Sequence, residues 1–257
     1  MLFKLKKQKK YSFIEEGEGH PIVLLHGLMG GLSNFDALMN YFTTHGYKVY
    51  APNLPILDMP ILNTNVGNVS KFVAKFLQDV VKEPATLVGN SLGGHVGLVV
   101  SSDHPELVHT LVLTGSSGLY EKSFGETFPK RGSYEYVKTK AEEVFYDPEV
   151  ATKEIVDEVY ETVNNSKKAI KILYIARSAI KHNMKGDLDK IKIPVCLIWG
   201  KQDGVTPPEV ALDFEAGLPN AKLYWIDKCG HAPMMEHPEL FNQILFDWLD
   251  PKVNKEK

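Results

Sequence analysis

Short apolar runs alternate with longer amphipathic stretches along this chain. In the last third, apolar residues recur every three or four positions from Leu240 to Leu249, as on one face of a helix. The runs that are apolar enough for buried strands cover residues 22–25, 48–51, 86–88, 110–113, 195–199 and 222–226. Strands that alternate with helices predict βαβ units. We therefore expect an α/β fold with a mostly parallel sheet flanked by helices.

Two of the helices are preceded by sequences typical of a capping box. Ser33 stands three residues before Asp36, and Thr206 stands three residues before Glu209. In a capping box the first side chain accepts a hydrogen bond from a free amide of the first helical turn. These motifs predict helices over 37–42 and 210–214.

The alternation of strands and helices stops between residues 116 and 187. This segment contains no convincing buried strand, whereas 155–163 and 169–180 have helical periodicity. We expect a helical cap over 116–187, inserted into a sheet-containing core formed by 1–115 and 188–257.

The predicted cap is rich in aromatic residues and has balanced charges, which suits a lid over an apolar pocket. The alternative is that these rings only pack the segment onto the rest of the protein. The aromatic residues are Tyr120, Phe124, Phe128, Tyr134, Tyr136, Phe145, Tyr146, Tyr160 and Tyr174.

Composition excludes few classes of protein. The 257 residues are 44% hydrophobic, which is enough for one large core. The formal net charge of -3 gives no overall attraction to polyanions, so we do not expect nucleic acid as a partner. The lysine-rich first ten residues are an exception, which we interpret as a solvated terminus.

The chain has no signal-peptide pattern and no apolar run long enough to span a membrane, so the sequence predicts a cytoplasmic protein. Its two cysteines, Cys196 and Cys229, are too few for a disulfide framework, and no Cys/His spacing fits a zinc site. We expect two free thiols and no metal. Cys229 is close to His231 in sequence, but it is interpreted as a small buried side chain.

The most informative chemical motif is Gly89-Asn90-Ser91-Leu92-Gly93, which lies between a predicted strand and a predicted helix. A G-x-S-x-G sequence at such a corner holds the serine in a strained backbone conformation, with its hydroxyl exposed. Glycines two residues on either side allow the strand and the helix to approach closely. Ser91 is therefore the predicted nucleophile.

A serine hydroxyl needs a neighbouring base, and the base needs an acid that orients it. His231 follows the predicted strand 222–226, and Asp203 follows 195–199. Both positions lie beyond the carboxyl ends of strands, where α/β sheets have their sites. Asp227 is the alternative acid, but it precedes the histidine by only four residues and is poorly suited to reach back to it.

The negative charge that develops on the substrate oxygen requires two donors already in place. The backbone N–H of Leu92, at the start of the helix, is one candidate. The backbone N–H of Leu28, in the glycine-rich turn after strand 22–25, is the other. His26 is interpreted as a residue that organises this turn. The turn lacks the Lys-Ser/Thr ending of a P-loop, so we do not predict phosphate binding there.

Taken together, these motifs resemble those of the α/β-hydrolase superfamily over almost the whole chain. The motifs are His26-Gly27, Gly89-Asn90-Ser91-Leu92-Gly93-Gly94, Gly200-Lys201-Gln202-Asp203 and Gly230-His231-Ala232-Pro233. The resemblance implies a catalytic triad of Ser91, Asp203 and His231, with Leu28 and Leu92 as the oxyanion hole. It also implies a cofactor-free serine hydrolase whose substrate is a small carboxylic ester or thioester. Neither the acyl-chain length nor the oligomeric state is predicted.

Within the superfamily, the motifs around Ser91 and His231 are similar to those of hydrolases that split carbon–carbon bonds in ring-cleavage products. That similarity implies that Arg177 binds a substrate carboxylate and that Asn90 contributes to substrate binding. The chain departs from those enzymes at Ala232, where they usually have an aromatic residue, and at the glycine-poor segment 51–55. Carbon–carbon bond hydrolysis is thus one alternative, and a ligand receptor with the hydrolase fold is another.

Overall fold

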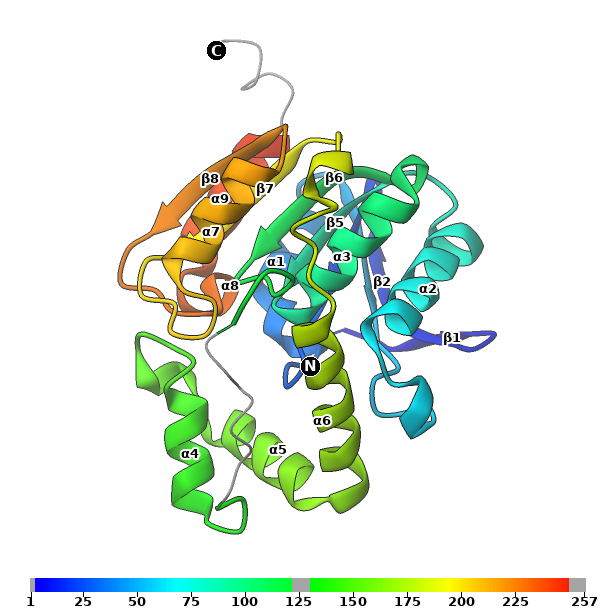
Figure 1. The fold of residues 1–257 in the computed structure, drawn as a ribbon. Helices are drawn as coiled ribbons and strands as arrows, with labels where there is room; N and C mark the ends of the chain where they lie inside the picture. Colours follow the sequence, from blue (N-terminus) through cyan, green and yellow to red (C-terminus); the bar gives the residue numbers. More distant parts are fainter. Residues whose placement is uncertain (1–2, 122–129, 250–257) are drawn as a thin grey trace.

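The computed structural model describes residues 3–121 and 130–249, which form an eight-stranded sheet with helices on both faces (Figure 1). The strand order is β1-β2-β4-β3-β5-β6-β7-β8, and the six strands from β3 to β8 pair in parallel. The strands are β1 (Lys6–Gln8), β2 (Tyr11–Gly17), β3 (His20–Leu25), β4 (Tyr47–Pro52), β5 (Ala85–Asn90), β6 (Val108–Thr114), β7 (Val195–Gly200) and β8 (Ala221–Ile226). The predicted α/β fold with a mostly parallel sheet is confirmed.

Nine α-helices lie within the described residues. They are α1 (Asp36–Thr43), α2 (Val66–Phe76), α3 (Leu92–Asp103), α4 (Tyr134–Glu142), α5 (Lys153–Asn164), α6 (Ser166–Lys181), α7 (Pro208–Gly217), α8 (Pro233–Glu236) and α9 (Pro238–Leu249). Short 3-10 helices precede two of them, η1 (Leu32–Phe35) between β3 and α1 and η2 (Ile61–Asn63) between β4 and α2. Among these helices, none is both long enough and apolar enough to cross a bilayer.

The hydrophobic core has two layers, one on each face of the sheet. Along β3, Val23 and Leu25 point toward the layer that contains α2, α3 and α7, whereas Ile22 and Leu24 point toward α1 and α9. A strand that is buried on both faces needs apolar side chains at every position. This requirement explains why the predicted strands appear in the sequence as continuous apolar runs.

Both predicted capping boxes are wrong, although the helices lie where they were expected. Ser33 lies inside η1, and α1 begins at Asp36 without a side-chain cap. Helix α7 begins at Pro208, and the Thr206 hydroxyl donates instead to the carboxylate of Asp203. The residue at the N-cap of α7 is Pro207, which has no side chain that could accept from the free amides of the first turn.

Between β6 and β7 the described residues form the helices α4, α5 and α6 and no strand. Figure 1 shows these three helices grouped together, beside the part of the molecule that contains the sheet. Helices α5 and α6 cover the two predicted helical stretches. The division of the chain into a core and a cap at residues 116 and 187 stays a prediction.

Candidate active site

Ser91 occupies the sharp corner between β5 and α3. Its backbone angles are φ 54° and ψ −120°, a conformation that a residue with a side chain rarely adopts. The corner is closely packed, because a Cβ atom on Gly93 would collide with the backbone of Leu25. The local sequence and the backbone strain both match a nucleophile elbow.

His231 and Asp203 form a buried pair close to this corner. The imidazole Nδ1 lies 3.0 Å from Oδ2 of Asp203 and 3.2 Å from Oδ1. The carboxylate also accepts hydrogen bonds from the amides of Val205 and Thr206 and from the Thr206 hydroxyl. These bonds fix the carboxylate where it can orient the imidazole. Because an ionised carboxylate only accepts, Nδ1 carries a proton and the other ring nitrogen, Nε2, is free to act as a base.

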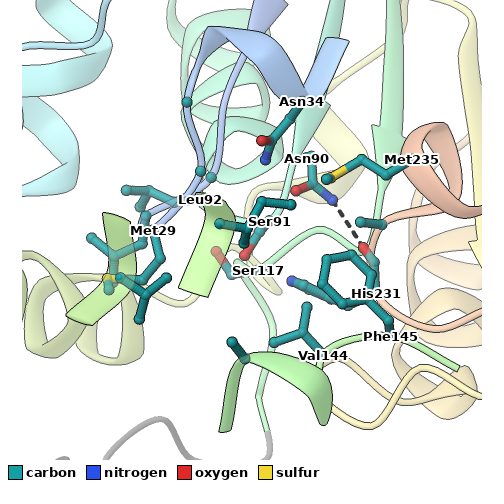
Figure 2. A pocket seen from close by; sticks show the side chains of 18 of the residues that line it. Met29, Asn34, Asn90, Ser91, Leu92, Ser117, Val144, Phe145, His231 and Met235 are labelled. Atoms are coloured by element: carbon teal, nitrogen blue, oxygen red, sulfur yellow. Dashed lines mark hydrogen bonds between the residues drawn. The ribbon is translucent and has the colours of Figure 1, made fainter. Parts of the chain in front are cut away.

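The Ser91 hydroxyl and the His231 ring point into the same pocket (Figure 2). Nε2 of His231 is buried and has no hydrogen-bond partner among the described residues. An unpaired buried nitrogen is costly unless a ligand or a moving hydroxyl completes it. His231 thus brings an unpaired ring nitrogen to the pocket that Ser91 also lines.

Opposing effects act on the pKa of His231. Burial lowers the pKa, but the carboxylates of Asp203, Glu121 and Glu236 together raise it by more than burial lowers it, so the net shift is upward. Glu121 is itself a pocket residue. Burial raises the pKa of its carboxyl, while His231 and the Ser117 hydroxyl lower it.

Asn90 joins the serine corner to the histidine loop. Its Nδ2 donates hydrogen bonds of 3.0 Å to the carbonyl oxygens of Thr114 and His231; Figure 2 shows the second of these. The two bonds use both amide hydrogens, so only the side-chain oxygen is left for a substrate. The contacts favour a positioning role over the predicted role in substrate binding.

The two predicted oxyanion donors belong to residues that line the pocket, Leu28 and Leu92. Leu92 is the first residue of α3, so its N–H has no acceptor within the helix. His26 anchors the loop before Leu28. Its Nε2 accepts from the amide of Leu54 at 3.1 Å, and its Nδ1 therefore donates to the Gly27 carbonyl at 2.8 Å.

The pocket is lined mainly by apolar side chains from the core loops and from α4, α5 and α6. Its apolar lining includes Leu28, Met29, Leu92, Ala141, Val144, Phe145, Ile155, Val159, Ala176, Ala179, Ile180, Ala232 and Met235. The charged residues of its described lining are Glu121, Lys140 and Glu158. The described part of the chain brings no three His, Cys, Asp or Glu side chains together as metal ligands.

The aromatic residues of the predicted cap have different environments. Phe145 lines the pocket, whereas the rings of Tyr134 and Tyr160 pack against each other with centroids 5.3 Å apart. Phe124 and Phe128 lie outside the described residues. Phe145 is thus the described aromatic residue of this segment that is placed to contact a substrate.

Arg177 does not line this pocket in the described structure. It lines a separate surface hollow with Leu62 and Lys181. Successive residues of a helix point about 100° apart. Because Ala176 and Ile180 of α6 line the pocket, the side chain of Arg177 faces away from it. The structure gives no geometric support to a contact between Arg177 and a substrate at Ser91.

The structure also shows where Asp227, the alternative acid, and Cys229, the cysteine close to His231 in sequence, lie. Asp227 is exposed and contacts Gln202 and Lys201 rather than His231. Cys229 is fully buried, and burial raises the pKa of its thiol, which keeps it protonated and unreactive. Neither residue competes with Asp203 or Ser91 in this geometry.

Sequence reasoning missed Glu236, which ties the histidine loop to the segment after α4. Its Oε1 accepts from the amide of Gly230 at 2.7 Å, and its Oε2 accepts from the amide of Tyr146 at 2.7 Å. Nothing near Glu236 in the sequence indicates these partners. Glu121 could have been found, since it follows closely on the carboxyl end of β6.

Comparison with known proteins gives consistent matches. The family model described as serine aminopeptidase, S33, matches residues 20–238. A 2-hydroxy-6-oxononadienedioate/2-hydroxy-6-oxononatrienedioate hydrolase of Paraburkholderia phymatum is 31% identical, over 89% of this chain and 86% of that protein. The enzyme of the same name from Comamonas testosteroni is 27% identical, over 91% and 89%.

Among solved structures, an α/β-hydrolase enzyme called MGS-MChE2, from the metagenome of sediments of the Mar Chica lagoon in Morocco, is 51% identical to this chain. The match has a TM-score of 0.79 and covers 95% of this chain and 97% of the other.

Proposed function

The chain belongs to the serine aminopeptidase S33 family of the α/β-hydrolase superfamily, and we propose that it hydrolyses a small carboxylic ester or thioester through an acyl-enzyme on Ser91. The observation that supports this most directly is the shared pocket. A strained serine and a buried histidine that is paired with a carboxylate line one mainly apolar cavity. An apolar cavity with a few polar groups suits an uncharged acyl group.

In the proposed reaction, Nε2 of His231 takes the Ser91 proton while Oγ forms a bond to the substrate carbonyl carbon. The N–H groups of Leu28 and Leu92 hold the oxyanion, and Asp203 stabilises the imidazolium. The intermediate then expels the alcohol or thiol, which takes the proton from His231. A water molecule, deprotonated by His231, cleaves the acyl-enzyme, releases the carboxylic acid and restores Ser91.

The test is hydrolysis of p-nitrophenyl esters of increasing acyl length by the wild type and by Ser91→Ala. The variant loses one hydroxyl, so we expect an unchanged fold by circular dichroism and a turnover reduced about 10⁴-fold or more. The chain-length optimum would then measure the depth of the pocket. Equal hydrolysis by the two proteins would refute the assignment of Ser91.

Carbon–carbon bond hydrolysis is the second candidate, because the names of the relatives specify dienedioate and trienedioate substrates. Such substrates carry two carboxylates. The described lining of this pocket has one lysine, Lys140, no arginine and the two carboxylates Glu121 and Glu158, and the Lys140 ammonium is already paired with Glu143 at 2.6 Å. Charge therefore favours an uncharged substrate.

The two candidates are separated by comparing kcat/KM for a p-nitrophenyl ester with kcat/KM for a vinylogous diketo acid, using the same enzyme preparation. We expect the ester to be the better substrate. Serine-dependent cleavage of the diketo acid at a higher kcat/KM would reverse the order of the candidates.

A further inference from the structure

We propose that the surface formed by η2 and α6 binds to anionic lipid bilayers. The surface is defined here by the side chains of Ile61, Leu62, Ile170, Tyr174, Arg177 and Lys181, and it is called the η2–α6 surface below. Figure 1 shows α6, which the contacts place beside η2 and beside α2.

Apolar side chains are concentrated on and beside this surface. Of the ten large apolar side chains that the described residues expose, five belong to η2 or α6: Ile61, Leu62, Ile170, Tyr174 and Ile180. Leu62 is 84% exposed, so its side chain makes little contact with the rest of the fold. Exposed apolar side chains that gather in one place mark a surface for binding another molecule.

Cations lie on the same helix as most of these apolar side chains, and two of them share a hollow with Leu62 and Tyr174. Helix α6 carries Lys167, Lys168, Lys171, Arg177 and Lys181 and no acidic residue, although the whole chain has a net charge of -3. Leu62 and Tyr174 line the same hollow as Arg177 and Lys181. A separate hollow, lined in part by residues of α2, contains three lysines, Lys10, Lys71 and Lys75, against one carboxylate, Asp58.

This combination matches a bilayer surface with negative headgroups. Lysine and arginine are attracted to the anionic headgroups, while protruding leucine and isoleucine side chains enter the boundary with the acyl chains. Nucleic acid would satisfy the cations but would leave Ile61 and Leu62 without apolar partners. Charge complementarity together with the protruding apolar side chains therefore selects the lipid surface.

The position of Ile180 connects this surface to the pocket. Ile180 is 56% exposed and also lines the cavity that contains Ser91. One side of α6 therefore faces the pocket, while the adjacent side carries the cations. When the η2–α6 surface lies against a bilayer, a molecule that moves from the bilayer to Ser91 would pass Ile180.

The experiment is flotation of the full chain with vesicles of phosphatidylcholine alone and of phosphatidylcholine mixed with phosphatidylglycerol. We expect binding to the mixed vesicles, little binding to the neutral ones, and loss of binding as salt screens the charges. Leu62→Ser should weaken binding about tenfold. Lys167→Gln together with Lys181→Gln should weaken it about 25-fold, or about five-fold for each charge, because Lys167 and Lys181 lie on the same side of α6 as Tyr174.

Matched controls lie on other parts of the molecule. Leu240→Ser removes a leucine that is 48% exposed on α9, and Lys192→Gln removes an exposed lysine before β7; both variants should bind like the wild type. All these side chains are exposed, so the variants should fold normally by circular dichroism. Absence of vesicle binding, equal binding to neutral vesicles, or equal losses in the controls would each overturn the proposal. Vesicle binding is measured without turnover, so this result is independent of the proposed ester hydrolysis.

Discussion

At the residue scale, the charge of His231 links activity and stability in opposite directions. Its pKa is raised in the folded protein, so folding favours the protonated imidazole. His231 therefore stabilises the fold fully below its ordinary pKa of about 6.5, and this contribution is lost as the pH rises through the higher folded-state value. The proposed base is the neutral imidazole. Activity should consequently rise over the same pH range in which this stabilisation is lost.

Glu121 is one source of this shift and can be tested alone. Glu121→Gln removes a negative charge that raises the pKa of His231. We expect the acid limb of the pH profile of kcat/KM for a p-nitrophenyl ester to move to lower pH. Glu158→Gln is the control, because it removes a carboxylate of the same pocket that is not among the groups shifting His231. If the acid limb of Glu121→Gln lies at the same pH as that of the wild type, Glu121 does not raise the pKa of His231.

The site residues that the sequence indicated lie at the ends of strands, whereas Glu236, which it missed, depends on a partner distant in sequence. Ser91, Asp203 and His231 each lie just beyond the end of an apolar strand, so local pattern was enough to select them, and the structure brings Asp203 and His231 into contact. Their catalytic roles remain predictions. Glu236 joins Gly230, six positions away, to Tyr146, which is 90 positions away, and local pattern does not encode such a distant partner.

At the element scale, the nucleophile corner depends on how closely α3 approaches β3. A Cβ atom on Gly93 would meet the carbonyl of Leu25, and neither backbone can move without disturbing the sheet. Gly97 lies one turn further along the same helix, where an added Cβ would approach only a methyl group of Leu111 at 2.9 Å. The same helix therefore offers a glycine that is required and one that is not.

We expect Gly93→Ala to lower the free energy of unfolding by about 3 kcal/mol or more and to abolish ester hydrolysis. Gly97→Ala should change stability by no more than about 1 kcal/mol, because better helix propensity offsets the shift of one methyl group. Urea unfolding of both variants measures the difference. Similar stability of the two variants would mean that the corner tolerates a larger distance between α3 and β3.

Periodicity predicted the positions of the helices better than their orientation. Helices α5 and α6 lie where their apolar periodicity indicated, but the face of α6 that meets the pocket depends on its neighbours, and Arg177 is on a different face. The pair β1 and β2 was not predicted. All three residues of β1 are exposed, so no apolar pattern marks that strand.

At the scale of the whole molecule, the pocket is formed between elements far apart in the sequence. The corner after β5 and the loop after β8 provide Ser91 and His231, and helices α4 to α6 provide much of the apolar lining. Glu236 holds the two parts together on one side through the amides of Gly230 and Tyr146. The position of His231 should therefore depend on the contact between α4 and the core.

Glu236→Ala would leave both amides without their acceptor, at a cost of about 1–3 kcal/mol for each that stays buried. We expect faster hydrogen exchange at Gly230 and Tyr146 and a lower kcat for ester hydrolysis. Glu239→Ala removes an exposed carboxylate nearby and serves as the control. Unchanged exchange at both amides in Glu236→Ala would show that other contacts hold the loop.

Labelling of the two buried thiols can measure local opening of the structure. Cys196 is the second residue of β7, which pairs with β6 and β8, and Cys229 lies in the loop that leads to His231; both are fully buried. A thiol-specific dye reacts only when a thiol reaches solvent, so each cysteine measures a different event. Cys229 should be labelled when the histidine loop opens, and Cys196 only when the sheet itself comes apart. A ligand that closes the pocket should therefore slow the labelling of Cys229 far more than that of Cys196.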